Sequence, residues 1–170
     1  MIRYTLYALL GIIAIVLQTT WLGSVSLGGA VADPLLVIVL AVGLLHGPEE
    51  GALVGAGVGL LQDIMTGVPL GLGMLGNMVV GFCAGLGQRS IYVEDLWMPA
   101  LAAAVMTVLR AIVWIGAAHL VGLLDVPFFE AVGVTVVAAC YNGVIAVPIF
   151  HGLRRLDRAL IRLYERSRQL

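Results

Sequence analysis

The sequence predicts an all-α integral membrane protein, with a compact bundle of about six transmembrane helices followed by a basic amphipathic helix. Hydrophobic residues make up 61% of its 170 residues and charged residues only 11%, whereas a soluble domain carries roughly 25% charged residues. Six of the nine basic residues fall in the last seventeen positions. There is too little charge to cover a water-facing surface, so we expect one membrane domain over residues 1–152 and a cytoplasmic tail over residues 153–170.

Six apolar segments are the candidate helices. They cover residues 4–22, 34–45, 51–66, 70–86, 96–124 and 127–150. The first resembles part of a signal peptide, with Ala30-Val31-Ala32 as a cleavage-like tripeptide. Fifteen residues, from Gln18 to Ala32, separate the apolar run from the cut that would follow that tripeptide, so we expect the segment to be retained as a span.

The second segment has a clear start and an unusual length. Asp33 can cap its first free amides, and Pro34 suits the first helical position because its missing N–H is not needed there. Twelve residues cover only ~18 Å of a ~30 Å hydrocarbon layer. We therefore expect the second and third helices to tilt together, thin the bilayer or form a re-entrant hairpin.

The distribution of arginine predicts the orientation, because short cytoplasmic loops collect positive charge. The C-terminus is predicted to be cytoplasmic, and six spans then place the N-terminus there as well. Leucines recur at helical spacing along the tail while arginines occupy its other face, which is typical of an amphipathic helix on the inner leaflet. Such a tail would anchor the helix to lipid or dock a partner through Arg154, Arg155, Arg158 and Arg162.

Glycines spaced four residues apart mark the third and fourth helices. Lipid provides no hydrophobic drive between helices, so rows of small residues allow two backbones to approach closely. We therefore expect these helices to pack as a tight hairpin through Gly51, Gly55, Gly59, Gly73, Gly81 and Gly85.

We single out four of the polar residues within the apolar segments, where each needs a partner. Arg110 is the most costly of them, and Asp63 is its predicted acidic partner, with Asn77 and Asn142 as further members of an intramembrane polar network. A buried network that fixes helix register and a site for a substrate or ion both fit these residues.

Enzyme chemistry finds little support in the sequence. His46, His119 and His151 are far apart, so no metal-binding spacing appears. We expect no catalytic residues, metal, cofactor or nucleic acid. A paired-carboxylate protease built on Asp63 and Asp125 is a remote alternative.

Two motifs resemble the MreD family of bacterial rod-shape-determining membrane proteins. The first is Asp33-Pro34-Leu35-Leu36-Val37-Ile38 followed by Gly59-Leu60-Leu61-Gln62-Asp63-Ile64-Met65-Thr66-Gly67-Val68-Pro69-Leu70-Gly71. The second is Tyr141-Asn142-Gly143-Val144 with Pro148 and the basic tail. The matched residues are Asp63, Gly67, Pro69, Leu70, Gly71, Asn142, Gly143 and Pro148.

The resemblance implies a non-enzymatic, multi-pass subunit of the elongation machinery in the bacterial inner membrane. Such a subunit would bind MreC and help to connect MreB to peptidoglycan synthesis by RodA and its penicillin-binding transpeptidase. MreD-like proteins are also thought to be similar in fold to the S-components of energy-coupling-factor vitamin transporters. A vitamin-binding S-component, with Asp63, Asn77 and Arg110 lining its cavity, is therefore the main alternative.

Overall fold

All the regular secondary-structure elements in the described part of the protein are helices. The structure, a computed structural model, describes residues 9, 11–16, 18, 20, 29–89, 97–122 and 128–168. Its elements are α2 (Pro34–His46), α3 (Pro48–Thr66), α4 (Leu72–Leu86), the 3₁₀ turn η2 (Gly87–Arg89), α5 (Met98–Leu120) and α6 (Phe128–Arg168). The predicted all-helical class is confirmed. Most of the predicted first span lies outside the described residues, although residues 11–16 are helical.

Length and apolarity separate two of these helices from the others. Within the described residues, α5 and a stretch of α6 are long and apolar enough to cross a membrane. Helices α2 and α4, with 13 and 15 residues, are apolar but shorter. Whether six segments cross the bilayer therefore stays a prediction.

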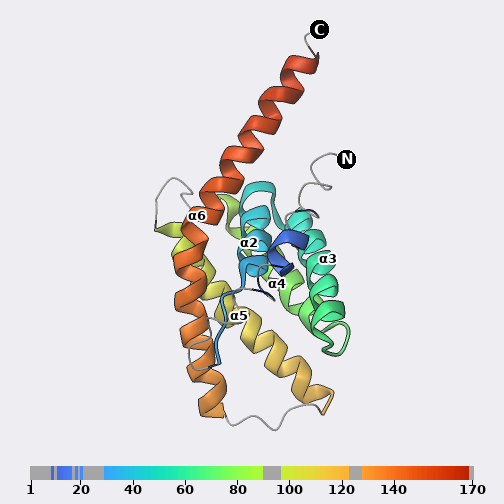
Figure 1. The fold of residues 1–170 in the computed structure, drawn as a ribbon, viewed down its shortest axis with the longest axis vertical. Helices are drawn as coiled ribbons and strands as arrows, with labels where there is room; N and C mark the ends of the chain where they lie inside the picture. The colour runs from blue at the N-terminus through green and yellow to red at the C-terminus, as the bar shows by residue number, and fades with distance from the viewer. Residues whose placement is uncertain are drawn as a thin grey trace.

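Helix α2 forms the centre of the bundle (Figure 1). It contacts α3, α4, α5 and α6, and every residue from Pro34 to Leu44 is buried. A helix that is apolar on all sides is stable when other helices surround it. Its start is as predicted, since Asp33 Oδ1 accepts a hydrogen bond from the Leu36 amide at 3.1 Å and Pro34 follows at the first position.

The short length of α2 leaves its first residue inside the bundle. Helices α2 and α3 meet at Gly47 (φ 99°) and contain 13 and 19 residues. At 1.5 Å per residue, the N-terminus of α2 lies about 9 Å short of the C-terminus of α3 if the two run side by side. We call the end of the bundle at residues 67–71 the hairpin end.

Helices α3 and α4 pack backbone against backbone. A Cβ atom built on Gly59 would lie 2.5 Å from the Gly73 carbonyl oxygen, and one on Gly51 or Gly81 would overlap the backbone of the other. Gly55 meets the backbone of Asn77, and Gly85 meets that of Pro48. No side chain fits at these contacts.

Helix α6 differs from the expected arrangement. We expected a separate amphipathic helix after residue 152, but α6 continues to Arg168 and its last turns project away from the bundle (Figure 1). Pro148 does not end the helix, and Leu153, beyond the expected boundary, still belongs to the buried core. His46 Nε2 lies 3.5 Å from Asp157 Oδ1, which ties the base of the tail to α2. A separate role for the tail remains a prediction.

Candidate functional site

A chain of polar side chains surrounds the buried N-terminus of α2. Five of them are at most 8% exposed, and the sixth, Arg110, is partly exposed. They come from four helices (α3, α4, α5 and α6) and from the residue that precedes α2. The set, called here the polar network, comprises Asp33, Gln62, Asn77, Thr107, Arg110 and Asn142.

Asp33 is the centre of the polar network, because each of its polar groups has a different partner. Its Oδ1 caps α2 through the Leu36 amide, and its Oδ2 forms an ion pair with Arg110 Nη1. Its backbone amide donates to Asn142 Oδ1 at 2.7 Å. One residue thus connects the start of α2 to both α5 and α6.

The remaining bonds extend the polar network to α3 and α4. Gln62 Oε1 accepts from Arg110 Nη2 at 3.2 Å and from Asn77 Nδ2 at 3.0 Å. On the other side, Asn142 Nδ2 donates to Thr107 Oγ1 at 3.0 Å. Unsatisfied backbone groups in a lipid environment cost several kcal/mol each, so a helix that ends inside the bundle needs such partners.

The predicted network is partly different from the observed one. Arg110 is linked to Asn77 through Gln62 and to Asn142 through Asp33. The predicted ion pair between Arg110 and Asp63 is wrong, because Arg110 pairs with Asp33. Gln62 and Thr107 were not predicted to belong to the network, and Asp33 was not predicted to pair with Arg110. The short length of the second apolar segment was the available signal, since a helix too short to cross must have a buried end.

Asp63 instead caps the neighbouring helix. Its side chain is buried, with Oδ1 accepting from the Gly73 amide at 2.9 Å and Oδ2 from the amides of Gly71 at 2.9 Å and Met74 at 3.2 Å. A carboxylate at a helix N-terminus also interacts favourably with the helix dipole. The carboxylate therefore closes the α3–α4 hairpin.

The other residues of the first motif form the turn of this hairpin. Gly67 (φ 70°) ends α3 and Gly71 (φ 107°) precedes α4, both in the left-handed region that favours glycine. The Pro69 carbonyl accepts from the Leu72 amide at 3.4 Å, and Leu70 is exposed. In the second motif, Gly143 allows α6 to approach the Ala100 carbonyl of α5.

The Asp63 cap leads to a prediction for Asp63→Asn. The amide places an NH₂ group against backbone donors, so at least one of the three bonds is lost. We expect the free energy of unfolding to fall by about 1–2 kcal/mol, as for other lost caps. Denaturation in mixed micelles measures this change, and hydrogen exchange should accelerate over residues 71–75.

Glu49→Gln is the matched control, because Glu49 is exposed at the start of α3. It should change the unfolding free energy by no more than roughly 0.5 kcal/mol. Equal stability of the two variants would contradict the assigned role of Asp63.

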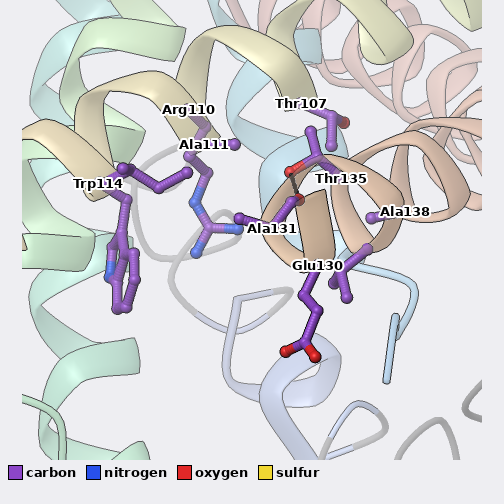
Figure 2. A pocket seen from close by; sticks show the side chains of 10 residues that line it. Thr107, Arg110, Ala111, Trp114, Glu130, Ala131, Thr135 and Ala138 are labelled. Carbon is purple, nitrogen blue, oxygen red and sulfur yellow. Dashed lines mark hydrogen bonds between the residues drawn. The ribbon is translucent and has the colours of Figure 1, made fainter. Parts of the chain in front are cut away.

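A cavity lies between α5 and α6, with Arg110 in its wall (Figure 2). Its volume is about 380 Å³, and it is open on one side. Asp63 and Asn77, which the S-component alternative would place in a ligand cavity, do not line it. Both are fully buried. Asp63 caps α4 in the α3–α4 hairpin, and Asn77 belongs to the polar network. The lining residues are Thr107, Arg110, Ala111, Trp114, Ile115, Glu130, Ala131, Val134, Thr135 and Ala138.

The features considered for enzyme chemistry have structural partners. Asp63 is occupied by three backbone amides, His46 faces Asp157, and His151 Nδ1 lies 2.8 Å from the Val147 carbonyl oxygen. Asp125 lies outside the described residues. Within the described ranges, no group of three or more His, Cys, Asp or Glu residues could hold a metal.

Comparison with known proteins supports a family assignment. The family model described as rod shape-determining protein MreD matches residues 1–156. Searches of curated proteins and of solved structures gave no significant match.

Proposed function

Since this chain belongs to the MreD family of rod shape-determining proteins, we propose that it is a non-enzymatic scaffold subunit of the elongation machinery. In this proposal it binds MreC in the bacterial inner membrane and links MreB to peptidoglycan synthesis by RodA and its transpeptidase. It crosses the membrane about six times, with both termini in the cytoplasm. The polar network favours a scaffold, because its bonds stabilise helix ends.

A groove on the α5–α6 pair supports a binding surface for a membrane span. It has a volume of about 600 Å³, and its walls are almost entirely apolar. Small residues are frequent in it, and such residues allow the backbone of another helix to approach closely. We assign this groove, called here the α5–α6 groove, to the transmembrane helix of MreC. It is lined by Trp97, Ala100, Ala104, Val108, Val136, Ala139, Cys140, Gly143, Val144 and Val147.

The chemistry of the groove favours a helix over a polar ligand. No charged residue lines it, so a hydrophilic molecule would lose its hydration without gaining a charged partner. An apolar helix would gain van der Waals contacts with the small residues while giving up only lipid contacts. MreC is the partner that the family assignment favours.

Ala104→Trp tests this assignment by filling the α5–α6 groove. Co-purification with tagged MreC should fall by about tenfold or more, because losing 1.4 kcal/mol of packing is sufficient for that change. Ile112→Trp is the control, since Ile112 is 63% exposed on α5 and does not line the groove. It should leave MreC recovery unchanged.

A photo-crosslinker at Val144, which is 74% exposed in the groove, should capture MreC, whereas one at Ile112 should not. Normal recovery of MreC with Ala104→Trp would contradict the groove assignment. Failure of the wild-type protein to bind MreC at all would contradict the proposed function.

The arginine tail has a separate proposed role. Arg155, Arg158 and Arg162 are exposed on the projecting part of α6. Each arginine near an anionic membrane surface contributes ~1 kcal/mol. We therefore assign this face to the cytoplasmic leaflet or to a cytoplasmic partner such as MreB.

A further inference from the structure

The cavity at Arg110 is not explained by a scaffold role. It lies between α5 and α6, the two helices whose length and apolarity suit a membrane span. Arg110 is the thirteenth of the 23 residues of α5, and its side chain is 22% exposed. A partly exposed guanidinium in the middle of such a helix cannot face hydrocarbon without a large cost. Water or a polar group must therefore fill the cavity.

The charges around the cavity indicate what kind of group fits. Arg110 is already neutralised by Asp33, which is itself buried. The second charged residue of the wall is Glu130, which is exposed in the first turn of α6. Within the described residues Glu130 has no ion-pair partner. The cavity wall therefore offers one uncompensated carboxylate together with a guanidinium that still has N–H groups to donate. That pattern is complementary to a cation and an oxyanion on the same ligand.

The two charged side chains of the cavity wall are placed so that one ligand can contact both. Figure 2 shows Arg110, Trp114 and Glu130 extending to the same side of the α5–α6 pair. Their neighbours in the wall, including Ile115 and Val134, are apolar. A polar group can thus be held at Arg110 and Glu130 while apolar chains contact the rest of the wall.

Size and access indicate that the ligand is an amphiphile. A volume of about 380 Å³ is at the small end of the range for ligand pockets, so it holds a headgroup better than a complete phospholipid. The open side allows acyl chains to leave the cavity between two apolar helices. We propose that the cavity binds the headgroup of a zwitterionic phospholipid, with its ammonium at Glu130 and its phosphate at Arg110.

Lipid binding can be tested by native mass spectrometry of the detergent-purified protein. The probes are phosphatidylethanolamine, phosphatidylglycerol and free phosphoethanolamine. We expect a one-to-one adduct with phosphatidylethanolamine and weaker binding of the other two. Glu130→Gln should reduce the phosphatidylethanolamine adduct roughly three- to fivefold, as expected when a partly exposed ion pair is lost. Ala138→Leu, which narrows the cavity, should reduce it as well.

Glu49→Gln is the matched control, because it removes one exposed carboxylate from a helix start outside the cavity. It should leave the adduct unchanged. The proposal is overturned if Glu130→Gln binds phosphatidylethanolamine as the wild type does, or if phosphatidylglycerol binds equally well. Equal binding of free phosphoethanolamine would also overturn the proposal, since the ligand would then be a soluble molecule and not a lipid. None of these outcomes depends on MreC, so the scaffold proposal can fail or succeed independently.

Discussion

Arg110→Met is expected to lower the free energy of unfolding by about 3–5 kcal/mol, the usual cost of removing one partner from a buried ion pair. Methionine retains much of the apolar stem, so the main loss is the guanidinium. Asp33 would then hold a charge at 5% exposure without its only ionic partner among the described residues. Gln62 Oε1 would also lose the bond from Arg110 Nη2.

Denaturation in mixed micelles, followed by far-ultraviolet circular dichroism, measures this effect. The control is Arg155→Met, because Arg155 is exposed on the tail and its replacement should cost no more than roughly 0.5 kcal/mol. Similar losses for the two variants would show that Arg110 is not held by the polar network.

A double-mutant cycle with Asp33→Asn tests the pairing itself. Asparagine can still cap α2, while its neutral side chain no longer needs a cation. The double variant should therefore be more stable than the sum of the single changes predicts, with a coupling of about 0.5–3 kcal/mol. Additive losses would indicate that Asp33 and Arg110 act independently.

Gly55→Ala is expected to destabilise the protein at or above the upper end of the usual 1–3 kcal/mol for overpacking. A Cβ atom at Gly55 would overlap the Asn77 carbonyl and lie 3.1 Å from the Met78 Cα. Backbone atoms cannot change rotamer to make room, so α3 and α4 must separate. That separation would also strain the bond between Gln62 and Asn77.

Gly57→Ala is the control for this prediction, since Gly57 is on the same helix and a Cβ atom there meets nothing within 4 Å. It should be neutral or slightly stabilising, because alanine favours a helix over glycine by roughly 0.5–1 kcal/mol. The free energy of unfolding of both variants can be measured in the same micelles. Equal effects at the two positions would rule out the close α3–α4 contact as their cause.

Several features of the fold could be predicted because they depend on neighbouring residues. The low charge content indicated apolar helices, and Asp33-Pro34 marked the start of α2 by the same hydrogen bond that the structure contains. The basic tail after residue 152, expected as a helix of its own, is continuous with the last apolar helix, while the end of the membrane span at that residue stays a prediction. Local sequence there shows a change from apolar to basic residues, whereas helix continuity depends on the backbone, and α6 continues beyond it.

The sequence by itself determined that Arg110 needs a partner, because a charge in an apolar helix has a large desolvation cost. It also indicated that Asp63, on a packed face of the third helix, needs a partner. Only the tertiary structure decided between the two aspartates. Asp63 caps α4 from the adjacent helix, which leaves Asp33, at the buried end of the central α2, to pair with Arg110. Which aspartate pairs with Arg110 depends on which helix ends lie at the same depth in the bundle as Arg110. The helical periodicity of the sequence contains no information about that depth.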